Sequence, residues 1–282
     1  MNPAYEEVIA SSDADRGTLF AEAAVRLGTA VQNVEKDFWV CWTLDALFNG
    51  LEAGSPRLLF KGGTSLSKAF TLIPRFSEDI DITVFREDIG QTTDAATLDA
   101  LSGKKRRIRL DAIREACQTY INGSLATQLR QHAKEIGKGR MKLEPDPDDS
   151  DKQKRTFWDK IIILHGLRQW HDRRGVLRHG GQRVSRHYYD IHQLMRHNRA
   201  HQWLENRVLA ADCATHARLF FGSADLGLTT AMHGSFTLTP PPAMREALKV
   251  DYIAMAGMIF GDVPSLDAIL ETIAKVELRV NS

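Results

Sequence analysis

The sequence predicts an α+β fold, with a small mixed sheet and flanking helices in the N-terminal half and a mainly helical C-terminal half. Two observations predict the sheet. Residues 57–60 end in an apolar run, residues 79–84 alternate carboxylate and isoleucine, and both patterns are typical of short strands. The third observation is the helical spacing of apolar residues along most of 156–280, which predicts the helical half.

The remaining elements follow in chain order from periodicity and from helix start and stop signals. We expect helices at 17–27, 33–48, 98–119, 124–136, 156–170, 186–197, 203–221, 242–260 and 265–280, and a third strand at 140–144. Asn33 and Ser185 are expected N-caps, because their side chains can accept a hydrogen bond from a free N–H of the first helical turn. Residues 86–97 and 171–183 lack periodicity and are expected to be loops.

A domain boundary is expected near residue 150. Residues 145–155 are polar and contain prolines, which indicates an exposed loop. The sequence therefore predicts an N-terminal domain at 1–150 and a helical domain at 151–282.

Composition is that of an ordinary globular chain of 282 residues, with 43% hydrophobic and 26% charged residues. A net charge of +1 neither favours nor excludes a nucleic-acid partner, because only local clustering of charge would do so. Cys41, Cys117 and Cys213 form no CxxC unit and indicate thiols in a reducing compartment. No secretory signal and no apolar run long enough to span a membrane is recognisable, so we expect a cytoplasmic protein without a membrane partner.

Residues 57–84 contain the most informative pattern. Gly62 and Gly63 follow the first strand, and two glycines allow a tight turn and a close approach of a ligand to the backbone. Thr64 or Ser65 can then cap a short helix that runs to about residue 70. The N–H groups and the positive dipole end of that helix are expected to bind an anion.

Two carboxylates follow this turn in the next strand. Asp79 and Asp81 are expected on one face, because side chains alternate along a strand, while Ile80 and Ile82 enter the core. Paired carboxylates suit Mg²⁺. A phosphate-binding turn beside them is what metal-assisted nucleotidyl transfer requires. The alternative interpretation is a structural turn with an exposed acidic edge.

These motifs resemble the first motif of the DNA polymerase β-like nucleotidyltransferases, in which a GG or GS turn and a short helix precede an acidic DxD strand. The longer string KGGTSLSKAF…RFSEDIDI is similar to the AbiEii-type nucleotidyltransferase toxins of bacterial toxin–antitoxin systems, and the likeness runs from VEKDFWV to the C-terminal helices. It implies a polymerase β-like core, a cleft between the two halves that holds an NTP, a cognate antitoxin partner, and the 3′ end of tRNA as acceptor.

The resemblance also implies roles for residues outside the first motif. Lys160 begins KIIILH, a string in which the toxins use a lysine for triphosphate binding, and its ammonium would offset leaving-group charge. Asp190 of SRHYYD matches a functional aspartate that would orient Lys160 or the acceptor hydroxyl; pairing with Arg186 one helical turn earlier is the structural alternative. The family's third metal carboxylate is expected at Glu144, with Asp146 as second choice.

The expected site is therefore a set of named residues. The expected catalytic residues are Asp79, Asp81, Lys160 and Asp190. The expected Mg²⁺ ligands are Asp79, Asp81 and Glu144. The expected nucleotide-binding residues are Lys61, Gly62, Gly63, Thr64, Ser65, Arg75, Ser77 and Lys160. Among these, Arg75 and Ser77 either bind phosphate or brace the loop before the acidic strand.

Two basic stretches bear on the acceptor. Lys104–Arg107 with Arg109, and the arginines of 171–183, are either solvated surface or contacts to an RNA backbone. They favour RNA over the alternative acceptor, a small molecule such as an antibiotic. A further alternative is a non-catalytic RNA- or protein-binding regulator, against which the presence of both aspartates and the lysine argues. The sequence contains no HExxH, G-x-S-x-G or P-loop motif.

Overall fold

The computed structural model describes residues 1–77, 79–137, 156–198 and 200–282. The chain forms two compact units, the first of Met1–Lys68 and Ser77–Gln153 and the second of Ala69–Phe76 and Lys154–Ser282. The chain thus leaves the first unit for eight residues, returns, and enters the second unit again later. The expected division at 1–150 and 151–282 contains no such excursion, and its boundary stays a prediction because residues 138–155 lie outside the described part.

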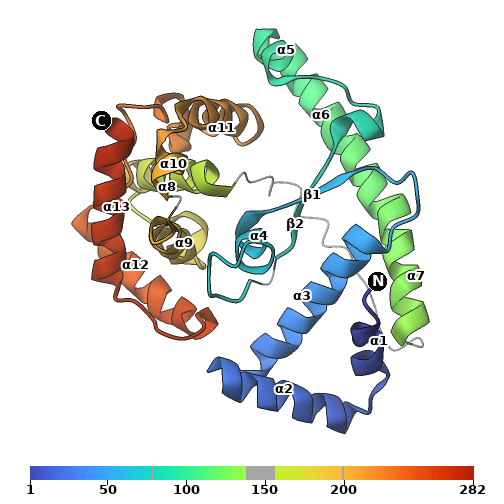
Figure 1. Ribbon diagram of the computed structural model, residues 1–282. Coiled ribbons are helices and arrows are strands. Elements are labelled where there is room, and N and C mark those ends of the chain that lie inside the picture. The colour runs from blue at the N-terminus through green and yellow to red at the C-terminus, as the bar shows by residue number, and fades with distance from the viewer. Residues whose placement is uncertain (78, 138–155, 199) are drawn as a thin grey trace. The chain divides into compact units, whose positions relative to one another are not determined.

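The first unit is mainly helical around one small sheet. Its elements are α1 (Pro3–Ala10), α2 (Asp13–Leu27), α3 (Val31–Asn49), β1 (Leu58–Lys61), α4 (Gly62–Lys68), β2 (Asp81–Val84), η1 (Arg86–Ile89), α5 (Ala95–Ala100), α6 (Gly103–Tyr120), η2 (Ile121–Leu125) and α7 (Ala126–Gly137) (Figure 1). Because η2 is a π-helical turn between α6 and α7, these three elements form one uninterrupted run of helix.

The sheet of the described residues is a two-stranded antiparallel pair, in which Leu58 lies opposite Val84 and Lys61 opposite Asp81. It is therefore antiparallel rather than mixed, because the chain between β1 and β2 brings the second strand back in the reverse direction. The third strand expected at 140–144 lies outside the described residues. The α+β class is confirmed.

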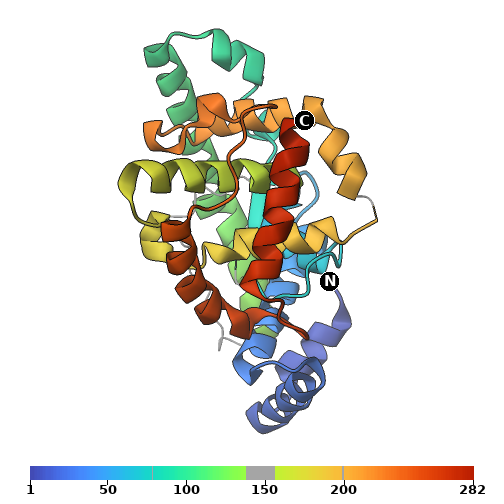
Figure 2. The same cartoon turned by 90° about the vertical axis from the view of Figure 1, so that its left-hand side faces the viewer.

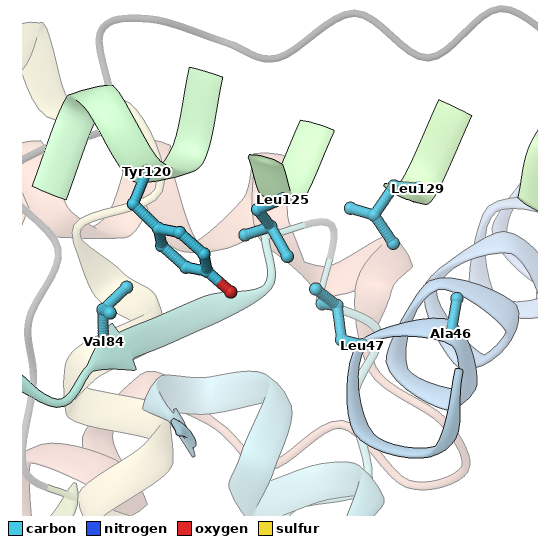
Figure 3. Close-up of a cluster of buried hydrophobic side chains, with 6 residues drawn as sticks. All are labelled: Ala46, Leu47, Val84, Tyr120, Leu125 and Leu129. Carbon is cyan, nitrogen blue, oxygen red and sulfur yellow. The ribbon is translucent and has the colours of Figure 1, made fainter. Parts of the chain in front are cut away.

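One face of this sheet carries a core of the first unit. The buried residues of this cluster are Ala46, Leu47, Val84, Tyr120, Leu125 and Leu129 (Figure 3). Leu58, Ile80 and Ile82 pack against it, so the prediction that both isoleucines enter the core is confirmed. Since side chains alternate along a strand, Lys61 and Asp81 lie on the opposite face.

The second unit is helical, as predicted for the C-terminal half. Its elements are α8 (Thr156–Arg174), η3 (Arg178–Gly181), α9 (Ser185–Met195), α10 (Ala200–Glu205), α11 (Arg207–Phe220), η4 (Ala224–Leu226), η5 (Leu228–Thr230), α12 (Pro242–Met255), η6 (Ala256–Met258) and α13 (Leu266–Asn281) (Figures 1 and 2). Helix α9 packs against α8, α12 and α13. This position explains why Tyr188, Tyr189, Asp190 and Ile191 are all fully buried.

Some helix ends differ from the sequence prediction for local reasons. Helix α3 begins at Val31, so Asn33 lies within its first turn, and the Asn33 side chain donates to the Thr29 hydroxyl instead of capping. The helix expected at 203–221 is divided at Asn206, whose side-chain oxygen accepts from the N–H of Leu209 and starts α11. Side-chain capping thus competes successfully with helix continuation.

The start of α9 is capped from a distant element. The carboxylate of Asp251 on α12 accepts hydrogen bonds of 2.6 Å from the N–H groups of Arg183 and Ser185. Ser185 itself belongs to the helix, so its expected role as N-cap is wrong. A cap supplied by another helix leaves no local signal in the sequence.

Other segments are more helical than expected. Residues 86–97 contain η1 and the start of α5, whose N-cap Asp94 accepts from the N–H of Thr97. Helix α8 continues to Arg174, into the segment expected to be a loop. Across the described residues, no helix combines the length and apolar character that crossing a bilayer requires.

Candidate active site

The turn after β1 depends on Gly62. Its φ of +74° lies in the left-handed region that favours glycine. A Cβ atom on Gly62 would lie 1.8 Å from Oδ2 and 2.6 Å from Cγ of Asp81. Gly62 therefore serves two purposes, since it allows the backbone to turn directly from strand into helix and allows the Asp81 carboxylate to lie against that turn.

The hydroxyls of Thr64 and Ser65 bond to nearby backbone. Both residues are buried inside α4, which begins at Gly62, so neither is the N-cap that the sequence predicted. The Thr64 hydroxyl donates to the carbonyl oxygen of Asp79, and the Ser65 hydroxyl donates to that of Gly62 at 2.8 Å. A hydroxyl has one proton to donate. That of Ser65 closes the turn on itself, and that of Thr64 joins the turn to the acidic segment.

The polar face of the sheet carries Asp81, one of the two expected carboxylates. Strand β2 begins at Asp81, and Asp79 lies two residues earlier, outside the strand. Ile82 packs on the core, so alternation places the neighbouring Asp81 on the opposite face, whereas the position of Asp79 on that face stays a prediction. Buried Lys61 lies directly across from Asp81 in the strand register, so both residues lie on the same face of the sheet.

The chemistry of this donor set fits a hard divalent cation. Carboxylate oxygens are preferred ligands of Mg²⁺, and Asp81 offers one such group beside the Gly62 turn, with Asp79 two residues before it in the chain. The expected third ligand, Glu144, and the second choice, Asp146, lie outside the described residues. Within the described ranges, three or more possible metal ligands do not gather at any one place.

The expected residues fall into two groups. The first unit contains Lys61, Gly62, Gly63, Thr64, Ser65, Ser77, Asp79 and Asp81. The second unit contains Arg75, Lys160 and Asp190, and it brings these three side chains into direct contact. Ser77 is buried just after the chain returns to the first unit.

Asp190 is the centre of a buried ionic cluster. Its Oδ1 accepts from Nε of Arg75 at 2.7 Å, and its Oδ2 accepts from Nη2 of Arg75 at 2.8 Å and from Nζ of Lys160 at 2.6 Å. The side chains of Arg75, Lys160 and Asp190 are 3%, 6% and 0% exposed. The sequence indicated the partnership of Asp190 with Lys160 but not the bidentate pair with Arg75.

The environment shifts the pKa values of this cluster in a definite direction. Burial alone would raise the pKa of Asp190, but the charges and hydrogen bonds of Arg75 and Lys160 outweigh burial and hold that pKa well below its usual range. Burial lowers the pKa of Lys160, Arg75 lowers it further, and Asp190 opposes both effects. Asp190 is therefore ionised throughout the physiological pH range.

The eight-residue excursion places Arg75 in this cluster. Phe76 N–H donates to the Met258 carbonyl at 2.8 Å, and Phe260 N–H donates to the Pro74 carbonyl at 2.9 Å. Arg75 forms a β-bridge with Ile259 between these two bonds. Backbone pairing to the segment after α12 thus fixes residues 74–76 within the second unit.

His165, at the end of the KIIILH string, has a structural role. It is fully buried, its Nδ1 accepts from the N–H of Thr237 at 3.1 Å, and its Nε2 lies 3.1 Å from the carbonyl of Gly227. This arrangement requires the neutral ring with its proton on Nε2. Burial lowers the pKa of His165, in keeping with a neutral ring.

The basic cluster of α6 divides into two kinds of residue. Arg106 donates to the backbone carbonyls of Leu98, Asp99 and Leu101 and so caps α5, and Arg109 donates to the Thr93 hydroxyl at 2.7 Å. The other three basic side chains, Lys104, Lys105 and Arg107, are exposed. The structure thus assigns a packing role to part of the cluster only.

Sequence reasoning missed one ion pair that holds the turn helix in place. The ammonium of Lys68, the last residue of α4, donates to Oδ2 of Asp37 on α3, and both side chains are about three-quarters buried. The two residues are 31 positions apart on separate elements, so no spacing rule could have paired them.

Comparison with known proteins identifies the family of the chain. The chain matches the family described as "Nucleotidyl transferase AbiEii toxin, Type IV TA system" over residues 45–149 and 152–272. None of the curated proteins and none of the solved structures compared with the chain matches it. The family match includes the glycine turn, both aspartates, Lys160 and Asp190, and covers most of the chain. The chain therefore belongs to the AbiEii family of nucleotidyl transferase toxins of type IV toxin–antitoxin systems.

Proposed function

We propose that this protein transfers a nucleoside monophosphate from an NTP to the 3′ end of a tRNA in a Mg²⁺-dependent reaction. The observation that carries the proposal is the contact between the Asp81 carboxylate and the Gly62 turn. A polyphosphate bound to the backbone of this turn would lie next to the Asp81 carboxylate. A metal-binding group beside a phosphate-binding turn is what nucleotidyl transfer requires.

Five residues of the first unit have a proposed task. Asp79 and Asp81 would hold the cation, which when bound polarises phosphoryl oxygens and favours ionisation of the attacking hydroxyl. The backbone N–H groups of Gly62 and Gly63 would bind phosphate. Thr64 would keep Asp79 in place through the hydrogen bond to its carbonyl oxygen. Glu144 as a third ligand stays a prediction.

Lys160 and Asp190 have a proposed electrostatic task. During transfer the acceptor hydroxyl loses its proton to water as its oxygen bonds to the α-phosphorus. The bond from that phosphorus to the bridging oxygen breaks, and pyrophosphate leaves with added negative charge. The Lys160 ammonium would offset that charge. Asp190 supports this proposal because its oxygen holds the ammonium at 2.6 Å in a site from which water is largely excluded.

An RNA acceptor is favoured by the exposed part of the α6 basic cluster. Lys104, Lys105 and Arg107 lie in the first turns of α6, which has no acidic residue in its first turn. Cations at a helix N-terminus oppose the helix dipole, so their presence there lowers the stability of the helix. Electrostatic attraction to the phosphate backbone of an RNA would offset this loss of stability. A small-molecule acceptor and a non-catalytic regulator remain the alternative functions.

The biological role follows from the family. The family is one of toxins in toxin–antitoxin systems. We propose that this chain inhibits growth through tRNA modification in the cytoplasm, and that a cognate antitoxin restrains it.

The decisive experiment supplies each of four labelled NTPs with Mg²⁺ and either total tRNA or a panel of small-molecule hydroxyls. We expect label in tRNA, with loss of labelling when EDTA is added and in Asp81→Asn. The matched control is Asp111→Asn, an exposed carboxylate on α6 that should leave labelling unchanged. Label in a small molecule alone would support the first alternative, and growth arrest by Asp81→Asn would support the regulator.

A further inference from the structure

Arg75 uses its guanidinium for contacts within the protein. The residue is 2% exposed, its Nε and Nη2 bind both oxygens of Asp190, and its Nη1 donates to the carbonyl of Phe76 at 3.0 Å. A bidentate arginine–carboxylate pair is strong and fixes the orientation of both groups. Of the two tasks that the sequence left open for Arg75, phosphate binding and bracing, these contacts favour bracing.

Lys160 is held in a different way. Among the described residues, its ammonium donates one hydrogen bond, to Oδ2 of Asp190, and Arg75 shares that oxygen. An ammonium has three protons to donate. The cluster formed by these three side chains contains two cations and one carboxylate, so its formal charge is +1. Asp190 therefore orients the Lys160 ammonium without fully neutralising it.

We propose that Arg75 is a positioning residue for the transfer reaction: by fixing Asp190 and sharing its charge, it keeps the Lys160 ammonium oriented and available to the phosphates of an NTP. This inference rests on the proposed role of Lys160 as a triphosphate ligand. Arg75 acts through Asp190 and Lys160 and does not itself contact the nucleotide.

Arg75 lies shortly before the two aspartates in the chain. Only Phe76, Ser77 and Glu78 separate Arg75 from Asp79. The backbone on either side of Arg75 is paired to the segment at Met258 and Phe260. The segment that leads into the acidic residues is thus fixed at Arg75 by side-chain and backbone bonds together.

The charged groups around Lys160 determine what removal of Arg75 does. They are Asp190 and Arg186 on α9 and Arg75 on the excursion, with Asp159 next to Lys160 on α8. Replacing Arg75 by glutamine removes one cation and leaves Lys160 as the partner of Asp190. The ammonium is then bound more tightly to Asp190, and the pKa of Lys160 rises.

The test measures KM for the NTP, kcat, and the pH profile of kcat/KM in Arg75→Gln and Arg75→Lys. We expect Arg75→Gln to raise KM by about 10- to 100-fold, to lower kcat less, and to move the alkaline limb of the profile to higher pH. Arg75→Lys keeps the charge but not the bidentate geometry. Its alkaline limb should therefore lie at the wild-type pH, and its KM should lie between those of wild type and Arg75→Gln. Arg245→Gln, which loses one hydrogen bond to the Pro240 carbonyl, is the control and should change neither quantity.

The outcomes separate this inference from the proposed function. Thermal unfolding and circular dichroism identify a variant that fails to fold, and Arg75→Lys then supplies the test. If Lys160→Met abolishes transfer while folded Arg75 variants keep the wild-type KM and pH profile, Arg75 is not a positioning residue. If Lys160→Met leaves transfer and NTP binding unchanged, the proposed role of Lys160 is wrong, and this inference is wrong with it.

Discussion

The carboxylate of Asp81 lies so close to the Cα of Gly62 that no side chain fits between them. A Cβ on Gly62 would come within 1.8 Å of Oδ2 of Asp81, and the left-handed φ of +74° separately disfavours any other residue. The register that pairs Lys61 with Asp81 fixes this contact, since it sets the end of β1 against the start of β2. The conformation of the turn and the position of the Asp81 carboxylate therefore depend on each other.

Gly62→Ala should abolish nucleotidyl transfer. The added methyl must displace either the turn or the Asp81 carboxylate, and the left-handed backbone adds about 1–2 kcal/mol of strain. Labelled-nucleotide transfer and thermal unfolding check this. The matched control is Gly28→Ala, whose φ is +63° with open space around it, so it should show only the stability loss due to backbone strain and keep activity. Wild-type transfer by Gly62→Ala would show that the contact is not required.

The Lys68–Asp37 pair should hold α4 against α3. Because both side chains are largely buried, a double-mutant cycle with Lys68→Met and Asp37→Asn should show a coupling of about 1 kcal/mol in the free energy of unfolding. Each single variant should also slow transfer, since α4 begins with the Gly62 turn.

The control for this pair is Lys275 with Glu271, an exposed pair one helical turn apart on α13. Breaking it should leave both stability and transfer unchanged. Independent, additive effects of Lys68→Met and Asp37→Asn would contradict the prediction.

His165 should make stability depend on pH. Its pKa in the folded protein is lowered by burial, so below about pH 6.5 the unfolded chain binds a proton that the folded chain does not. Its contribution is therefore complete above about pH 6.5 and declines as the pH falls. His192, whose pKa is also lowered by burial, acts in the same direction.

The measurement is the free energy of unfolding of His165→Gln between pH 8 and pH 5. The variant should be less stable than wild type by about 1–2 kcal/mol at pH 8, because glutamine replaces the bonds to Gly227 and Thr237 imperfectly. The difference should narrow toward pH 5. His233→Gln, at an exposed position, should leave the pH dependence unchanged. A difference that stays constant with pH would show that His165 titrates normally.

The exposed basic residues of α6 should contribute to RNA binding. Replacing Lys104 and Lys105 by glutamine should weaken tRNA binding and reduce the slope of log K against log salt by about one per lost contact. Binding titrations at several salt concentrations check this. Arg106→Gln is the contrasting variant: it should lower stability, because its guanidinium caps α5. An unchanged salt slope in the double variant would assign RNA binding to another surface.

Local patterns predicted much of the fold. The alternation at 79–84 correctly placed Ile80 and Ile82 in the core, and helical spacing correctly predicted a helical second half. The glycine pair correctly indicated a tight turn, because only glycine tolerates that conformation and that contact. These signals depend on neighbours a few residues apart.

Contacts between distant residues could not be predicted in the same way. Arg75 and Asp190 are 115 positions apart, and Asp251 caps α9 from another helix. The hydroxyl of Thr64 suited helix capping by sequence, but the arrival of Asp79 fifteen residues later gave it a different acceptor. In each case the partner of a polar group comes from a distant part of the chain, so its neighbours in sequence do not indicate it.

The excursion of residues 69–76 limits which fragments of this protein can fold as in the intact chain. A fragment that stops near residue 150 would carry Ile73 and Phe76, both almost completely buried in the intact chain, with nothing from the second unit to cover them. The complementary fragment would retain Asp190 but lack Arg75, the counterion that bonds to both of its oxygens. Neither recombinant half would contain all the residues of its unit. The roles of the two units should therefore be tested with point substitutions in the intact chain and not with truncated fragments.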